Sequence, residues 1–140
     1  MKSLTLSSKI CDVMAEDAKR AYPSECCGIL FGQGGKIIRV LPVRNTVLSQ
    51  RNRTHFQIDP LLVYQAEHEA AKEGLMILGI YHSHPDNPAL LSPEDIAYMI
   101  PGMIYIILSI EDGSDKELRG YTKEPDSEDP VQIMIEKEVT

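Results

Sequence analysis

Residues 75–85 read Leu-Met-Ile-Leu-Gly-Ile-Tyr-His-Ser-His-Pro, and they are the part of the chain that says most about its architecture. Its first seven residues form a compact apolar run, which is typical of a strand buried on both faces in a sheet that helices cover. His82 and His84 follow at the end of the run, two residues apart, so their side chains point to the same face. The stretch therefore predicts a central strand that ends in two neighbouring imidazoles.

The segments on either side carry the periodicity and end signals of further elements. We expect strands over residues 3–7, 27–32, 36–43, 103–110, 117–123 and 131–136, with a turn at 33–35. We expect helices from Ser8 as the cap to Pro23, from Asp59-Pro60 to Gly74, and from Ser92 to Pro101-Gly102. Because helices and strands are interspersed along the chain, the sequence predicts an α/β or α+β domain with a mixed sheet.

Length and composition suit a single domain over residues 1–140. Hydrophobic residues make up 43% of the chain and charged residues 25%, so we expect a packed core and exclude a disordered chain. The longest strongly apolar stretch, residues 103–110, is far shorter than the roughly 20 residues of a membrane-spanning helix. The N-terminus shows no apolar signal segment, so the cytoplasm is the expected location.

The charge is uneven along the chain. The formal net charge of −7 argues against a nucleic-acid-binding protein, and residues 111–140 alone hold ten acidic and four basic side chains. The interval from Glu25 to Asp59 has no acidic residue between its ends, and its basic residues are Lys36, Arg39, Arg44, Arg51 and Arg53. This interval is either an ordinary solvated surface or a positive one, and for its arginines we predict a contribution to docking an acidic partner.

The three cysteines, Cys11, Cys26 and Cys27, do not indicate a disulfide framework, because two neighbours in sequence rarely bridge. The absence of a Cys-x-x-Cys pair excludes thioredoxin-like chemistry and zinc ribbons. The adjacent pair allows a thiol-protease interpretation with His82 or His84 as the partner. We instead expect small buried hydrophobic side chains, since nothing else in the chain supports a cysteine nucleophile.

His82 and His84 can bind one metal ion, and a catalytic zinc site typically has three protein ligands and one open position. Pro85 ends the strand, and the ten residues that lead to Asp95 are enough for the chain to fold back over the strand end. Asp95 is therefore the best candidate for the third ligand. Taken alone, Ser92-x-x-Asp95 is also a capping box, in which Asp95 only satisfies backbone N–H groups. The conjunction of these features favours a metal site.

His82-Ser83-His84-Pro85, followed after six residues by Ser92-x-x-Asp95, resembles the metalloprotease motif of the JAMM, or MPN-plus, domain. Three further parts are similar to the same family: the segment Pro23–Gly32, which contains Glu25, then Asn45, and then residues 56–60. The resemblance spans roughly residues 5–110, and the acidic C-terminal part matches only loosely.

This resemblance implies the JAMM/MPN architecture, which is cytidine deaminase-like, with a curved mixed sheet flanked by helices. It implies a zinc ion held by His82, His84 and Asp95 together with a bound water. It also implies that Glu25 is the general base and then the general acid, and that Ser92 donates a hydrogen bond to the oxyanion. Without the resemblance, Glu25 is an ordinary loop residue and Ser92 an N-cap, a role that we expect to compete with oxyanion donation.

The resemblance further implies a zinc peptidase or isopeptidase that cuts the amide bond after the Gly-Gly tail of a ubiquitin-like protein. Short prokaryotic members release cysteine or another amine from a ubiquitin-like sulfur-carrier protein, and deconjugation of small modifier proteins from lysine is a second implied activity. A non-catalytic binding module and a hydrolase of small amides stay open as alternatives. We expect the tail to pair with a sheet edge beside the strand that precedes His82. No nucleic-acid or membrane partner is expected, and the oligomeric state is left open.

Overall fold

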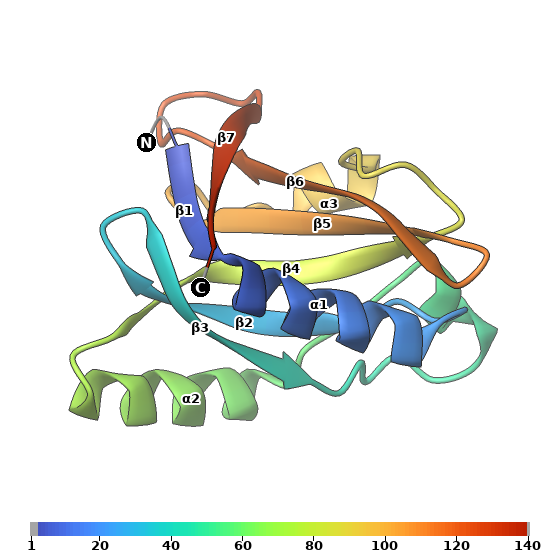
Figure 1. The fold of residues 1–140 in the computed structure, drawn as a ribbon, viewed down its shortest axis with the longest axis horizontal. Coiled ribbons are helices and arrows are strands. Elements are labelled where there is room, and N and C mark those ends of the chain that lie inside the picture. The colour runs from blue at the N-terminus through green and yellow to red at the C-terminus, as the bar shows by residue number, and fades with distance from the viewer. Residues whose placement is uncertain (1–2, 140) are drawn as a thin grey trace.

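The computed structural model describes residues 3–139, in which seven strands form one sheet that closes into a barrel (Figure 1). The strands are β1 (Ser3–Ser7), β2 (Cys27–Gln33), β3 (Lys36–Val43), β4 (Met76–Pro85), β5 (Ile104–Glu111), β6 (Ser114–Thr122) and β7 (Val131–Glu138). The helices are α1 (Ser8–Ala21), α2 (Pro60–Lys72) and α3 (Pro93–Ala97), and a 3-10 turn spans Gln50–Arg53. No helix within these residues is both long and apolar enough to cross a membrane.

The sheet is mixed, as the interspersed elements predicted. Around the barrel the order is β1-β3-β2-β4-β5-β6-β7; β4 runs parallel to β5, β1 runs parallel to β3 and β7, and the other pairs are antiparallel. Strand β1 pairs with β7 at five positions but with β3 only through Thr5 and Lys36. The sheet is thus curved, as expected, and strongly enough to close into a barrel. Strand β1 closes it, and the β1–β3 pairing is the short side of this closure.

Strand β4 lies between β2 and β5 and is buried on both faces, as expected from its apolar run. Tyr81 belongs to the core that Met14 and Ala18 of α1 cover. Ile80 points the other way and packs with Tyr105 and Met99, on the side of the sheet that carries α3. Because side chains alternate along a strand, the two histidines of β4 lie on the Ile80 face, away from α1.

The helix starts follow from the capping residues. The hydroxyl of Ser7 accepts a hydrogen bond from the backbone N–H of Ile10 at 3.1 Å, so the cap of α1 is Ser7 and not the expected Ser8, which is already helical. Asp59 caps α2 as expected, by accepting from the N–H of Leu61. The turn between β2 and β3 has positive φ at both Gly34 and Gly35, which glycine adopts without strain.

The elements that carry the candidate ligands end at different distances from their expected bounds. Strand β4 ends at Pro85, in register with Ile110 of β5, so the two histidines lie at its end as expected. Helix α3 ends at Ala97 and does not reach Pro101. The hydroxyl of Tyr105 accepts the N–H of Ile100 at 2.6 Å, and this contact holds the chain after α3 in a turn.

Candidate metal centre

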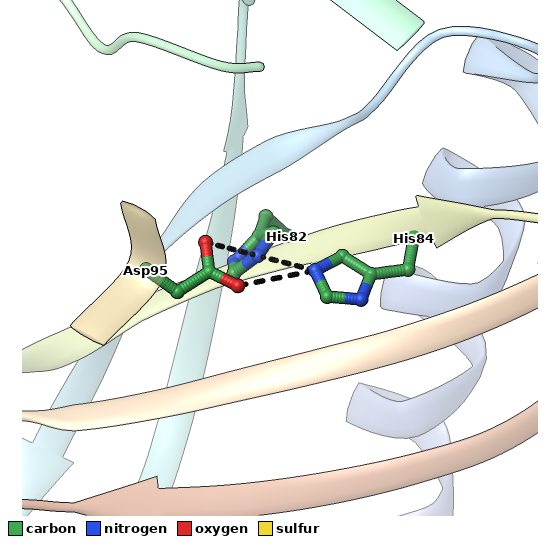
Figure 2. A group of neighbouring side chains, drawn as sticks. All are labelled: His82, His84 and Asp95. Carbon is green, nitrogen blue, oxygen red and sulfur yellow. Dashed lines mark hydrogen bonds and ion pairs between the residues drawn. The ribbon is translucent and has the colours of Figure 1, made fainter. Parts of the chain in front are cut away.

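Two elements bring three potential ligands together. His82 and His84 project from one face of β4, and Asp95 projects from the first turn of α3 towards them (Figure 2). The His82 side chain is 2% exposed and that of Asp95 is 13% exposed. The structure thus places all three side chains of the sequence-based ligand set in one cluster, whose donor atoms lie within 4.8 Å of one another.

The spacing of the donor atoms suits a small tetrahedral ion. The Nε2 atoms of His82 and His84 are 3.2 Å apart, and they lie 3.3 Å and 3.2 Å from the two carboxylate oxygens of Asp95. Tetrahedral ligands at about 2.0–2.1 Å from zinc are separated from each other by about 3.3 Å. Two imidazoles and a carboxylate are also ligands that zinc commonly takes, so the donor set and its spacing fit a metal ion.

Asp95 is at once a helix cap and a neighbour of both histidines. Its Oδ2 accepts the N–H of Ser92 at 2.9 Å, and the Ser92 hydroxyl accepts the N–H of Asp95 at 3.0 Å, which is a complete capping box. The sequence posed the cap and the metal ligand as alternatives, whereas the geometry allows both. At Ser92 the hydroxyl that accepts at the cap keeps its own proton for donation, so the expected role as an oxyanion donor stays a prediction beside the cap.

The titration of the cluster favours an anionic Asp95. Burial alone would raise the pKa of Asp95, but the contacts with His82 and His84 outweigh it and hold the pKa far below its usual range. Burial lowers the pKa of His82. Burial also opposes protonation of His84, yet its contacts with Asp95 and with a backbone carbonyl raise its pKa overall. A carboxylate that stays ionised is the form that binds a cation.

The two histidine rings are held in place by different contacts. Nδ1 of His84 lies 2.8 Å from the carbonyl oxygen of Pro88, which leaves Nε2 free to face the cluster. Nδ1 of His82 is buried and has no hydrogen-bond partner in the described part of the chain. Instead, the ring of Phe56 stacks on the His82 ring with centroids 4.5 Å apart. Sequence reasoning noted residues 56–60 without giving Phe56 this role, because the contact joins residues far apart in the chain.

Glu25 lies beside the metal cluster without belonging to it. It is 5% exposed and lines the same cavity as His82 and Asp95. Burial, with further contributions from the Asp95 and Glu94 charges, raises the pKa of Glu25 to about 8, although nearby His84 lowers it. No group among residues 3–139 donates a hydrogen bond to its carboxylate. A buried, unbonded carboxylate with this pKa is suited to take up and release a proton near neutral pH.

The cavity that Glu25 lines has a volume of about 570 Å³ and extends from His82 back along β4 to Ile77. Its walls are mostly apolar and come from both sides of the strand, with Val63 of α2 on one side and Tyr98 and Met103 near α3 on the other. At its rim, Nε2 of His55 lies 3.0 Å from a carboxylate oxygen of Glu94. The sequence left His55 without a role, and the structure shows that it ties the loop after β3 to α3.

The structure bears on two other sequence-based interpretations. All three cysteines are free, and burial raises the pKa of the Cys27 thiol to about 12, so the buried hydrophobic role is confirmed for the adjacent pair and a thiolate nucleophile is disfavoured. The pairing of a substrate tail with a sheet edge beside the strand that precedes His82 stays a prediction. Strand β4 is hydrogen-bonded to β2 from Met76 to His82 but to β5 only from Gly79 to Pro85, so residues 76–78 have no partner on β5.

Several known proteins are similar to this chain in sequence. A family model described as prokaryotic homologues of the JAB domain matches residues 7–121. A protein named desampylase from Pyrococcus furiosus is 32% identical over 112 residues, which cover 80% of this chain and 76% of that protein. A CysO-cysteine peptidase from Mycobacterium tuberculosis is 29% identical over 139 residues, which cover 94% of this chain and 91% of that protein.

Solved structures show the same fold. A protein from Desulfitobacterium hafniense is 31% identical, with a TM-score of 0.81 over 98% of this chain and 94% of the other. A JAB1/MPN domain protein from Archaeoglobus fulgidus is 18% identical, with a TM-score of 0.62 over 97% of this chain and all of the other. The JAMM/MPN architecture expected from the motif is thereby confirmed. Since the family model covers most of its length, this chain belongs to the prokaryotic homologues of the JAB domain.

Proposed function

We propose that this chain is a zinc-dependent peptidase that hydrolyses the amide bond after the C-terminal Gly-Gly of a ubiquitin-like or sulfur-carrier protein, for example to release cysteine. Relatives named CysO-cysteine peptidase and desampylase support this substrate class. The observation that carries the proposal is the placement of three converging metal ligands beside a buried carboxylate that has no hydrogen bond, at one end of an apolar cavity.

Each polar side chain of the site has a part in the proposed reaction. His82, His84 and Asp95 hold the ion, which when bound supplies Lewis acidity and lowers the pKa of a water molecule from about 15.7 to about 7. Glu25 accepts the proton of the attacking water and delivers it to the leaving amine nitrogen, so that this nitrogen departs as a neutral amine. The Ser92 hydroxyl donates a hydrogen bond to the carbonyl oxygen as negative charge develops there.

The proposal includes zinc as the ion, the cytoplasm as the compartment and residues 1–140 as one functional domain. Nitrogen and carboxylate ligands at tetrahedral spacing support zinc. Three unpaired cysteines suit a reducing compartment. The single sheet that runs through all seven strands supports one domain.

The test uses elemental analysis followed by a cleavage assay. Purified protein is expected to contain about one zinc per chain, and the variant His84→Ala none. The substrate is the ubiquitin-like sulfur carrier of the same organism with one cysteine added after its Gly-Gly tail. Mass spectrometry should show loss of that cysteine, and a chelator should stop the loss. A protein that neither contains nor takes up a metal would contradict the proposal and favour the non-catalytic binding module.

A second activity, removal of a modifier from lysine, is favoured by the relative named desampylase. The same carrier joined through its terminal glycine to the ε-amine of a lysine peptide tests this activity. Faster cleavage of the lysine conjugate than of the cysteine adduct would make deconjugation the main reaction. Cleavage of a free dipeptide but of neither protein would favour the small-amide hydrolase.

A further inference from the structure

The position of Glu25 is fixed by its backbone, because its carboxylate has no hydrogen-bond partner among residues 3–139. The N–H of Glu25 donates to the carbonyl oxygen of Asn52 at 2.7 Å. The N–H of Cys26 donates to the Ser83 hydroxyl at 2.8 Å, and the N–H of Ser83 donates to the carbonyl oxygen of Cys26 at 3.2 Å. These bonds tie the residue after Glu25 to the metal-binding strand.

The remaining backbone group, the carbonyl oxygen of Glu25, is held by a side chain. The Nδ2 atom of Asn45 donates to it at 3.1 Å and also to the carbonyl oxygen of His55 at 3.0 Å. The Oδ1 atom of the same side chain accepts the N–H groups of Val47 and Gln57 at 3.0 and 3.2 Å. Asn45 thus makes four hydrogen bonds, the full donor capacity and both acceptor sites of an amide.

These four bonds join three segments that are distant in sequence. They are the turn that bears Glu25, the chain after β3 at residues 45–47, and residues 55–57, which include Phe56 against the His82 ring. No other type of side chain of this size offers two donors and two acceptors in one plane. Within the described residues, the only other side-chain hydrogen bond that joins 45–47 to 55–57 runs from the Thr46 hydroxyl to the Gln57 carbonyl oxygen.

We propose that Asn45 is the positioning residue for Glu25: its amide sets the distance between the general base and the metal cluster. The inference rests on the proposed function, because it gives the Glu25 carboxylate its role in the reaction. A displacement of about 1 Å in a catalytic group can lower a rate about 100-fold, so loss of the Asn45 amide is expected to reduce turnover without reducing substrate or metal binding.

The experiment compares Asn45→Ala with Thr46→Val, both in the full chain loaded with zinc. Asn45→Ala is expected to lower kcat roughly 10- to 100-fold, with KM and zinc content within twofold of the wild type. Thr46→Val removes a hydrogen bond between the same two segments but none to Glu25, and it should leave kcat unchanged. A matching fall in zinc content, or a rise in KM that accounts for the loss, would overturn the inference in favour of a general structural role.

A double-mutant cycle separates action through Glu25 from any other effect. In the Glu25→Gln background, measured in single turnover, Asn45→Ala should cause no further loss, because the group that it positions is no longer a base. An equal loss in both backgrounds would overturn the inference. If Asn45→Ala fails to fold, Asn45→Asp is used, since it keeps the two accepting contacts and loses only the donors to the Glu25 and His55 carbonyl oxygens.

Amide hydrogen exchange needs no substrate, so it tests the positioning of Glu25 independently of the proposed function. Amide hydrogen exchange at Glu25 and Cys26 should become at least about tenfold faster in Asn45→Ala and should stay unchanged in Thr46→Val. Unchanged exchange in Asn45→Ala would refute the positioning role whatever the enzyme cleaves. Faster exchange in Asn45→Ala, together with a wild-type chain that cleaves neither carrier conjugate, would contradict the proposed function and leave the placement of Glu25 by Asn45 intact.

Discussion

Two acidic side chains share the centre, and the segments that present them are built in opposite ways. Asp95 lies on a helix turn where every carboxylate oxygen has a polar neighbour: Oδ1 has His82, and Oδ2 has His84 and the backbone of Ser92. Glu25 lies on an irregular turn where hydrogen bonds hold the backbone, while its largely buried side chain lines the cavity and its carboxylate accepts no hydrogen bond from residues 3–139.

The difference in surroundings separates the two pKa values. Contacts with the histidines lower the pKa of Asp95, whereas burial raises that of Glu25 to about 8. One carboxylate is therefore fixed as an anion that can hold a cation, and the other can exchange a proton near neutral pH. The role of each acid in this site is therefore set by the groups that its carboxylate oxygens contact. If so, substitutions at Asp95 and at Glu25 should impair the protein in different ways.

The largest effect is expected from Asp95→Ala. Removal of the carboxylate leaves only two imidazoles, too few to retain the ion, so zinc content and hydrolysis should both fall to background. Glu94→Gln, one residue earlier on α3, serves as the control for zinc content, since Glu94 contacts His55 and not the two ligating histidines. Full zinc content in Asp95→Ala would show that Asp95 is only a helix cap.

Glu25→Gln should lower kcat roughly 10²- to 10⁴-fold, the usual contribution of a general base, while zinc content stays at the wild-type level. The amide has nearly the same shape but cannot accept a proton. This variant sharpens the contrast with Asp95→Ala, because each acid then fails in a different way. Loss of zinc from Glu25→Gln would place Glu25 among the ligands and break the comparison.

The raised pKa of Glu25 also predicts how stability depends on pH in the zinc-free protein. Its pKa is 4.5 in the reference state and about 8 in the fold, so the folded chain binds this proton more tightly. The resulting stability is complete below about pH 4.5 and is lost as the pH rises to about 8, a change on the order of a few kcal/mol.

Urea unfolding of the zinc-free wild type and of Glu25→Gln between pH 5 and pH 9 measures this effect. Since glutamine has no proton to lose, the variant should gain stability relative to the wild type as the pH rises. A difference between the two proteins that stays constant across this range would show that the Glu25 carboxylate is solvated and not buried in the fold.

Two substitutions at Ser92 test whether this side chain is only the N-cap of α3 or also an oxyanion donor. Alanine at an N-cap costs about 1 kcal/mol of stability and glycine only a few tenths, because glycine leaves the backbone open to water. An oxyanion donor, in contrast, is lost in both variants, at a cost of roughly 10²-fold in kcat. Ser92→Gly and Ser92→Ala should therefore be equally slow in turnover. A nearly wild-type rate in Ser92→Gly would leave the serine only its capping role.

The smallest effect is expected from the arginines of residues 50–53, the segment whose Asn52 carbonyl oxygen accepts the N–H of Glu25. Arg39 is paired with Glu73, but Arg51 lines the cavity and, like Arg53, makes no ion pair within residues 3–139. Reversal of Arg51 and Arg53 to glutamate should raise KM a few-fold at low salt, with less effect at high salt, if an acidic carrier docks there.

The control for this charge reversal is the pair Lys9→Glu and Lys137→Glu, which changes the net charge equally but lies at the start of α1 and on β7, where β7 pairs with β1. An unchanged KM in the Arg51 and Arg53 variant at low salt would dismiss these arginines as a docking surface. An equal rise in both double variants would assign the effect to net charge alone.

The sequence predicted the parts of this molecule that depend on short patterns. The strand of residues 75–81 followed from its apolar run, and the convergence of its two histidines with Asp95 followed from strand alternation and a helix start. The turn at Gly34-Gly35 and the Asp59 cap are equally local. The chemical roles of Glu25 and Ser92 rest on the resemblance and stay predictions. No local pattern distinguishes a catalytic base from a loop glutamate, or an oxyanion donor from an N-cap serine.

The rest depends on contacts between distant segments, which local patterns do not encode. The pKa of Glu25, the stacking of Phe56 on His82 and the four bonds of Asn45 arise only when the loop after β3 folds back over β4. Closure of the barrel through β1 likewise joins the two ends of the chain.

The capping box of α3 has a consequence for how the site is loaded. Because Ser92 and Asp95 hold each other through backbone hydrogen bonds, the carboxylate keeps its orientation whether or not an ion is present. Binding an ion then requires little loss of side-chain entropy at this ligand, since the helix has already restricted it. Metal exchange in this protein should accordingly be a fast local event, limited by access of the ion through the cavity and not by refolding of the chain.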